Sequence, residues 1–253
     1  MKSTRSIASW ITGALMIIFT ATTFAQSSES PITPGAGEGR IWGSGGVIQL
    51  DQNWTWYADG GFHAGITNRI SIGFPLAISF ALLKNAPTEV AVTGGVTDFW
   101  STQLNRWLYT PSAHITAKSH LSHEAGAYYS VDYTHVQTNF NKSPGFLRGA
   151  AAFWVDMGPY LSWCIGISYQ RILVKRPFTE ELHRSGLAGA QRVTLGSVRA
   201  TPFNDLPVLT INTGTLLSFI IHARLDIDTD TDTTDARILG GIQFSRQTTA
   251  PAP

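Results

Sequence analysis

The chain contains a single cysteine, Cys164, so no disulfide can form within it. Only 14% of its 253 residues are charged. After residue 25 no stretch reaches 18 uninterrupted apolar residues, which excludes a membrane-spanning helix from that part of the sequence. The sequence has no phosphate-binding loop, dinucleotide fingerprint or metal-spaced cluster of Cys and His, and it therefore predicts no cofactor.

The first 25 residues have the layout of a secretory signal peptide. Lys2 and Arg5 precede an apolar, uncharged stretch, and small residues flank a cleavage site before Gln26. The alternative is a membrane anchor helix, but the apolar stretch is shorter than the roughly 20 residues such a helix needs. Without this segment the chain has 16 basic and 17 acidic residues. That balance gives no electrostatic reason to expect nucleic acid as a partner.

Two consecutive segments, 54–66 and 70–83, alternate between apolar and small or polar residues. Side chains of a strand point to opposite faces of the sheet in turn, so each segment has one apolar face. Strands of soluble sheets typically have about 5–6 residues, whereas a tilted membrane-crossing strand needs about 9–11. The pattern predicts a closed antiparallel transmembrane β-barrel.

Similar alternation recurs to near the C-terminus. The sequence predicts a flexible lead-in at 26–39, a barrel at 40–246 and a C-terminal tail at 247–253. Twelve strands are expected, or ten if neighbouring segments fuse: 40–50, 54–66, 70–83, 89–99, 108–119, 124–136, 149–157, 161–172, 191–200, 207–213, 215–227 and 236–246. Aromatic residues lie near segment ends, as at the two interfaces of a membrane barrel. A soluble periplasmic β-sandwich, with its aromatics toward strand centres, is the alternative.

A three-residue turn, Thr67, Asn68 and Arg69, is expected after the second segment, because paired residues must share a face and Ile66 then pairs with Ile70. Short turns of bacterial barrels lie on the periplasmic side. If this turn is periplasmic, simple alternation puts 84–88, 120–123, 158–160, 201–206 and 228–235 outside. The same alternation puts 137–148 and 173–190 on the periplasmic side, where they are long for such turns.

Residues 65–76 (GITNRISIGFPL) resemble the turn-plus-strand signature of Gram-negative outer-membrane barrels, in particular transporters of the phenol-degradation meta-pathway type. The resemblance implies a porin-like barrel in the bacterial outer membrane. Its partners would be outer-membrane lipid, lipopolysaccharide, the barrel assembly machinery and a small solute. Such barrels usually end on an aromatic residue; here only Phe244 lies near the end.

His120 and Ser122 share a strand face, which can place a base beside a nucleophile. The stretch 120–126 is similar to the His-x-Ser pair of outer-membrane lipases and lipid A deacylases, although His123 stands where those enzymes have Asn. The pair falls on the lumen side, away from lipid. Polar residues at a strand end explain it better, and no catalytic residue is predicted.

Carboxylates at alternate positions, Asp228, Asp230 and Asp232, make a weak surface candidate for Ca²⁺, the cation that prefers such oxygens. The glycine and closing glutamate of a calcium loop are missing, so a solvated acidic loop is the simpler interpretation. The candidate lumen-lining residues are Asp59, His63, Lys118, Asp132, Asp156, His222 and Arg224.

Three functions remain open at this point: a narrow pore or transporter for small solutes, a non-conducting structural or surface-interaction barrel, and a lipid-hydrolysing barrel using His120 and Ser122. Barrels of about eight strands are filled by side chains and those of 16–18 leave a channel, so ten or twelve strands lie between these cases. Abundant small residues on the inward face favour the narrow pore.

Overall fold

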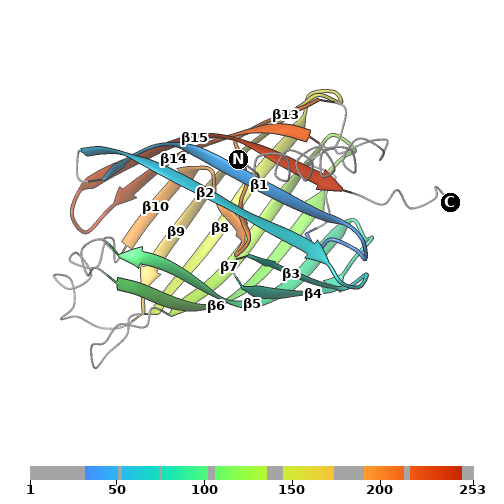
Figure 1. Ribbon diagram of the computed structural model, residues 1–253, viewed down its shortest axis with the longest axis horizontal. Helices are drawn as coiled ribbons and strands as arrows, with labels where there is room; N and C mark the ends of the chain where they lie inside the picture. Colours follow the sequence, from blue (N-terminus) through green and yellow to red (C-terminus); the bar gives the residue numbers. More distant parts are fainter. Residues whose placement is uncertain are drawn as a thin grey trace, which may run out of the picture.

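A computed structural model describes residues 32–50, 53–74, 76–101, 106–135, 145–173, 191–213 and 217–246 (Figure 1). The predicted signal peptide and the C-terminal tail lie outside these residues. All the elements are strands: β1 Gly39–Leu50, β2 Asn53–Gly65, β3 Ile70–Phe74, β4 Ala77–Leu83, β5 Thr88–Ser101, β6 Arg106–His120, β7 Ala125–His135, β8 Gly145–Asp156, β9 Leu161–Ile172, β10 Gln191–Gly196, β11 Arg199–Thr201, β12 Asn204–Asp205, β13 Leu209–Asn212, β14 Leu217–Asp228 and β15 Thr233–Arg246.

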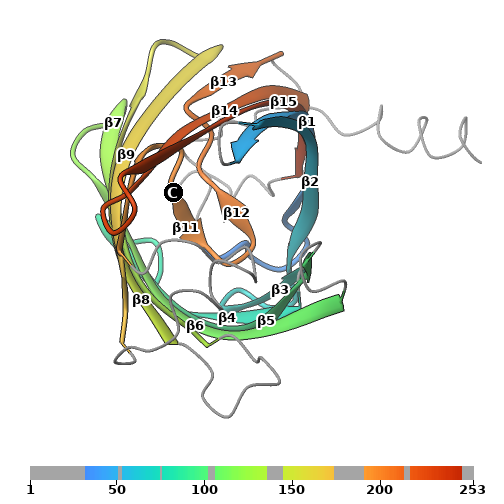
Figure 2. The same cartoon turned by 90° about the vertical axis from the view of Figure 1, so that its left-hand side faces the viewer.

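Thirteen of these strands form one antiparallel sheet that closes because β1 pairs with β15 as well as with β2. β10 and β13 occupy the same position in the wall, between β9 and β14. The barrel therefore has twelve wall positions, as predicted. Figure 2 looks into it from one end and shows β11 and β12 inside the ring.

The interruption between β10 and β13 follows from the register. Gly196 pairs with Gly166 of β9, and Leu209 pairs with Trp163, three residues further along. The other neighbour, β14, advances by the same three residues. Two residues would therefore join β10 to β13 in a continuous strand. The chain instead uses residues 197–208, which fold inward and are called the plug from here on.

The prediction that 70–83 forms a single strand is wrong. The segment forms a short hairpin in which β3 pairs with β4 from Ile70↔Phe80 to Gly73↔Ala77. The predicted segments 191–200 and 207–213 are likewise wrong as two separate wall strands. The twelve-strand count holds because one error adds a strand and the other removes one.

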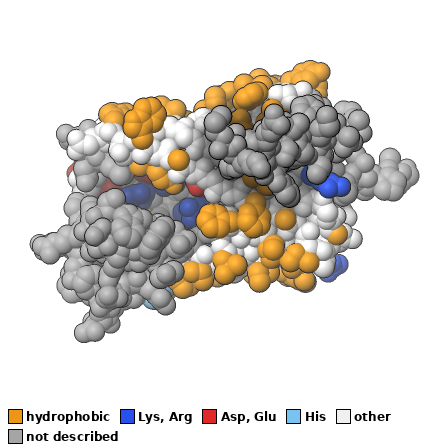
Figure 3. All heavy atoms as spheres, viewed as in Figure 1, with side chains coloured by type: hydrophobic (Ala, Val, Ile, Leu, Met, Phe, Trp, Pro, Cys, Tyr) orange, Lys and Arg blue, Asp and Glu red, His pale blue; other side chains and the backbone are white. Residues whose placement is uncertain are grey.

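Inside and outside faces follow the predicted parity. On β9, Trp163, Ile165, Ile167 and Tyr169 are 46–57% exposed, whereas the alternate residues Ser162 and Ser168 are at most 8% exposed. Many further large apolar side chains are exposed on the outer face, which Figure 3 shows as orange patches. A soluble sandwich would bury these side chains, so the alternative is wrong. Within the described residues no helix is long and apolar enough to cross a membrane.

The two ends of the barrel differ. The connections 66–69, 84–87, 121–124 and 157–160 lie at one end, together with the connection from β13 to β14, the start of β1 and the end of β15; this is called the short-turn end. The other end has the two longest connections, from β7 to β8 and from β9 to β10, and is called the long-loop end; the short connections from β1 to β2, from β5 to β6 and from β14 to β15 lie there too. The alternation predicted from the sequence is therefore wrong, except that 228–235 does lie at the end opposite Thr67. Residues 84–88, 120–123 and 158–160 share an end with Thr67, and 201–206 lies in the lumen.

Residues 32–38, part of the predicted flexible lead-in, pack against the short-turn end of the lumen. Ile32 and Thr33 are buried, and the Ile32 amide donates to Glu89 Oε2 at 3.1 Å. Gly35 passes so close to Gly65 that a side chain at Gly65 would collide with the Gly35 carbonyl. This segment thus narrows the lumen from one end, while the plug occupies its middle.

Candidate functional site

The plug crosses the lumen and reaches the opposite wall. Thr116 Oγ1 on β6 donates to the Ala200 carbonyl at 2.5 Å, and Ser130 Oγ on β7 donates to the Arg199 carbonyl at 3.1 Å. The plug is also closed on itself, because the Leu206 amide donates to the Val198 carbonyl at 2.9 Å. Since inward polar groups of β6 and β7 meet plug carbonyls, the lumen is bridged from one side to the other.

Phe203 is the apolar anchor of the plug. It is 2% exposed and packs with Trp42, Ala77 and Ile220, which come from three different wall strands. Its ring stacks on the His63 imidazole, with centroids 4.2 Å apart. His63 Nε2 and Ser71 Oγ, 2.7 Å apart, hydrogen-bond across β2 and β3. Phe203 thereby closes the part of the lumen behind the β3–β4 hairpin.

Asp205 is the polar anchor. Arg237 Nη2 of β15 donates to its Oδ2 at 3.0 Å, and Arg199 Nε donates to its Oδ1 at 3.4 Å. Arg224 Nη1 of β14 lies 3.9 Å from Oδ2. Asp205 lies in the plug, outside the membrane-spanning strands. Burial alone raises the pKa of its carboxyl, but the three guanidinium groups outweigh this and hold that pKa well below its ordinary value.

The ion pairs continue beyond Asp205. Arg224 Nε donates to both oxygens of Asp226, at 2.9 and 2.8 Å, and Arg192 Nη1 lies 3.8 Å from Asp226 Oδ2. The Arg237 guanidinium lies over the Tyr57 ring, 5.0 Å from its centroid. These pairs join four guanidinium groups to two carboxylates, on the long-loop side of the plug. We call Arg192, Arg199, Arg224 and Arg237 the arginine cluster.

The structure places the predicted lumen-lining residues on the inward face of the wall, but in different surroundings. His63, Lys118, Asp132, Asp156 and His222 are buried. Asp132 pairs with Arg148, whose Nε donates to its Oδ1 at 2.6 Å. Arg224 belongs to the arginine cluster. Asp59 is exposed, although it lies on the inward face of β2.

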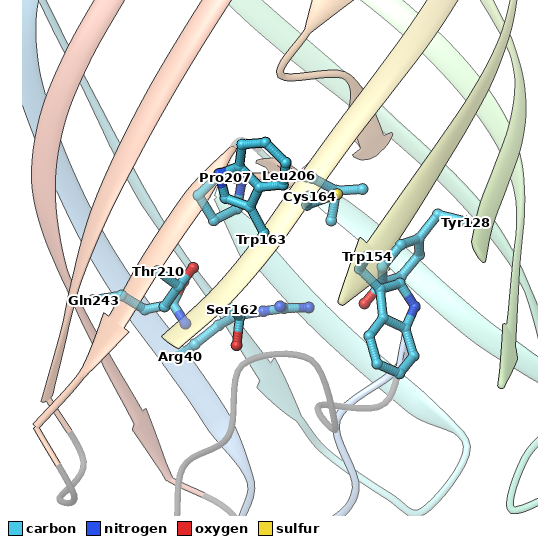
Figure 4. Close-up of a pocket in the computed structure, with 10 residues that line it drawn as sticks. All are labelled: Arg40, Tyr128, Trp154, Ser162, Trp163, Cys164, Leu206, Pro207, Thr210 and Gln243. Atoms are coloured by element: carbon cyan, nitrogen blue, oxygen red, sulfur yellow. The ribbon is translucent and has the colours of Figure 1, made fainter. Parts of the chain in front are cut away.

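A small pocket lies on the short-turn side of the plug (Figure 4). Leu206 and Pro207 of the plug line one part, and Arg40, Ser162 and Gln243 line another. Tyr128 and Trp154 close the far side, and the Lys118 ammonium lies over both rings, 5.6 and 5.5 Å from their centroids. Cation–π contacts of this kind stabilise a buried ammonium group.

The wall has a side opening at the β3–β4 hairpin. β3 reaches β2 only as far as Phe74↔Phe62, and β4 begins its pairing with β5 at Ala77↔Gly95. Residues 54–60 of β2 and 97–101 of β5 therefore have no strand partner on this side among the described residues. In β2 both faces are exposed from Asn53 to Trp56. Figure 3 shows charged side chains in a hollow between the apolar bands, where Figure 1 has β2 on one side and β5 and β6 on the other.

Two strands are missing from this opening. Where β3 and β4 lie between them, β2 and β5 are three strand spacings of about 4.8 Å apart, or about 14 Å between backbones. Tyr57 belongs to the part of β2 that pairs with β1 alone among the described strands, and it contacts Arg237. The arginine cluster therefore lies beside the opening.

The candidate enzyme residues make separate contacts. Ser122 lies in the turn 121–124, where its Oγ accepts the Glu124 amide at 3.2 Å. His120 packs edge-on against Trp154, with centroids 5.5 Å apart. The turn Thr67, Asn68 and Arg69 connects β2 to β3; Thr67 Oγ1 accepts the Arg69 and Ile70 amides at 3.2 and 3.0 Å.

The calcium candidates do not converge. Asp228 is buried and its Oδ1 accepts the Asp230 amide at 2.9 Å, while Asp230 and Asp232 lie in the turn from β14 to β15. In the part of the chain that the structure describes, no three His, Cys, Asp or Glu side chains form a group that could hold a metal ion.

No protein-family model matches the chain, and no curated protein matches it. Among solved structures it is similar to the crystal structure of Ail, the attachment invasion locus protein of Yersinia pestis. The two share 10% sequence identity with a TM-score of 0.24, over 85% of this chain and 100% of the Ail chain. A superposition of that quality carries no functional argument, and the barrel assignment rests on the strand pairing itself.

Sequence reasoning missed Phe203, Asp205, Arg192 and Arg199 as lumen residues. One signal was available: Pro202 and Pro207 flank Asn204 and Asp205, and such clusters mark turns. These prolines predict a connection between strands, and simple alternation of the strands places that connection outside the barrel. Turn-forming residues do not indicate whether a connection folds outward or into the lumen.

Proposed function

We propose that this protein is a Gram-negative outer-membrane barrel that passes small solutes, and that the plug holds it closed at rest. The observation that supports the proposal is the register around the plug. Residues 197–208 form no strand pair of the wall, and two residues suffice to make β10 and β13 continuous. The end residues of the plug are hydrogen-bonded to the wall through the backbone, Ser197 to Ala223 and Val208 to Ile221 and Cys164, and the two residues of a continuous strand would occupy these positions. The wall can therefore close without the residues between them.

The outer-membrane location is part of the proposal. The chain has apolar outward faces, polar inward faces and an N-terminal segment typical of exported proteins. The short-turn end would then be periplasmic and the long-loop end extracellular. The resemblance to transporters of the phenol-degradation meta-pathway type agrees with this function and remains a prediction. If the protein leaves cells by osmotic shock without detergent, the location is wrong.

Conductance of the purified protein in planar bilayers tests the pore. One variant has 197–208 replaced by Val-Thr, which puts Val on the outward and Thr on the inward parity of the restored strand. A second variant also lacks residues 26–38, since 32–38 narrows the lumen. Wild-type protein should conduct rarely or weakly, and at least one variant should show stable open steps.

A same-length replacement of 197–208 by Gly and Ser is the matched control, because it keeps the chain length but removes Phe203 and Asp205. We expect flickering currents from it. The competing function is a non-conducting structural barrel, which the occupied lumen favours. If both shortened variants fold, as judged by heat-modifiable migration on gels, and neither conducts, the barrel is non-conducting and the proposal is refuted.

A further inference from the structure

We propose that the side opening and the arginine cluster together form a binding site for an anionic amphiphile, a molecule with one carboxylate or phosphate head and an apolar tail. The head would pass through the side opening and take the place of the Asp205 carboxylate on Arg237 and Arg199, and the tail would lie along Trp54 and Trp56 on the outer face of β2. This site goes beyond the proposed passage of small solutes and does not depend on conductance.

The first argument concerns what the side opening can face. Residues 54–59 and 97–101 carry backbone N–H and C=O groups with no strand partner on this side among the described residues. Unsatisfied backbone groups cost several kcal/mol each in hydrocarbon, and open sheet edges are not found against lipid. The opening therefore holds water or the polar end of a ligand.

The second argument concerns the chemistry behind the opening. Arg237 contacts Tyr57 on the part of β2 beside the opening, and Arg199 has a side chain 39% exposed. Arg237 Nε is buried and has no hydrogen-bond partner among the described residues. Arg224 and Arg192 pair with Asp226, whereas the carboxylate that pairs with Arg237 and Arg199 in the described part of the chain is Asp205. A planar guanidinium matches carboxylate and phosphate oxygens, so this pair of arginines selects an anion.

The third argument concerns the tail. Trp54 and Trp56 lie on the outward face of the same stretch of β2 and are 54% and 84% exposed. Asp59, exposed on the inward face of β2, disfavours a second anionic group on the ligand. The site therefore fits one anionic head and one apolar tail.

The test uses two probes with the same brominated tail, 11-bromoundecanoate and 11-bromoundecanol, added to full-length protein in a neutral maltoside detergent. Bromine quenches tryptophan fluorescence on contact, so Trp54 and Trp56 report the tail. We expect saturable quenching by the carboxylate and at least roughly tenfold weaker binding of the alcohol, since hydrogen bonds to charged groups contribute on that scale. Trp56→Phe should reduce the quenching amplitude. Equal binding of the two probes would mean partitioning and would overturn the site.

Three variants separate the site from general stability. Asp205→Asn removes the competing carboxylate and should tighten carboxylate binding several-fold, whereas Arg237→Gln should weaken it roughly tenfold. Asp132→Asn makes the same change in the wall pair with Arg148 and should leave binding unchanged. A destabilised fold would weaken binding in Asp205→Asn, so unchanged or weaker binding there refutes the proposal. If acetate or inorganic phosphate displaces the probe at the same concentration as undecanoate, the site takes free anions and the tail has no place in it.

Discussion

Replacing Phe203 by Ala should loosen the plug while leaving the barrel wall intact. Phe203 is 2% exposed, packs with Trp42, Ala77 and Ile220, and stacks on His63 at 4.2 Å. Removing a buried Phe side chain costs about 3–5 kcal/mol. If the wall keeps its strand pairing, as the register allows, the whole of this free-energy loss lowers the stability of the closed plug relative to the open one. The opening equilibrium constant should then rise by roughly two to three and a half orders of magnitude, at about 1.4 kcal/mol per tenfold.

Hydrogen–deuterium exchange followed by mass spectrometry measures this opening directly. Peptides that cover 197–208 should exchange faster in Phe203→Ala, and peptides from β8 should not. Phe153→Ala is the matched control, because Phe153 is 45% exposed on the outer face of β8 and does not contact the plug. If exchange of 197–208 is unchanged while the melting temperature falls, Phe203 stabilises the wall instead of the plug, and the reasoning is refuted.

Gly73→Ala should act in the same direction, because a Cβ at Gly73 would collide with the Phe203 ring as well as with the Phe62 carbonyl of the wall. The part of its effect on plug exchange that comes from Phe203 should disappear in a Phe203→Ala background, which a double-mutant cycle measures. The Asp205 contacts should persist in acid. The folded-state pKa of Asp205 is lowered, so its stabilisation is complete above the ordinary Asp range near pH 3.9 and is lost only as the pH falls through the lower folded value. Plug exchange corrected for intrinsic rates should therefore be constant from pH 8 to 5, and a marked increase in that range would contradict the assignment. An epitope inserted at 229–232 should be labelled by antibody on intact cells, and one inserted at 121–124 only after permeabilisation; the reverse labelling would invert the barrel.

The sequence predicted the faces of the strands well, because lipid outside and water or protein inside impose a strict two-residue period. The outward set of β9 and the buried serines opposite it are where alternation places them. The lumen-facing parity of His63, Lys118, Asp132 and His222 follows from the same rule. The rule does not predict which of these side chains contact each other, because such contacts depend on strands distant in the sequence and on the plug.

Both errors in strand assignment have one physical cause. Paired residues share a face, so the hairpin Gly73↔Ala77 leaves an odd number of residues in its loop and the alternation continues through it. The plug uses twelve residues where two would serve, and an even excess also preserves the parity of Leu209. The alternation of apolar and polar residues therefore does not reveal the hairpin or the plug. Only local chemistry marks them: Pro75, which lacks the N–H of a central strand, and the Pro-flanked turn before Leu209.

The missed hairpin also determines which end of the barrel faces which compartment. One extra reversal of chain direction at β3–β4 transfers every later connection to the opposite end, which is why simple alternation assigned 173–190 to the side where short turns belong. With the reversal included, the two longest connections, from β7 to β8 and from β9 to β10, share the end opposite the start of β1 and the end of β15, although three short connections lie there as well. Bacterial barrels have short periplasmic turns and longer extracellular loops.

Because the hairpin ends its pairing at Phe74↔Phe62, the side opening lies toward the long-loop end. In the orientation proposed above, the arginine cluster behind it faces the outer half of the membrane, and an anionic amphiphile bound there would come from the outer leaflet or from outside the cell.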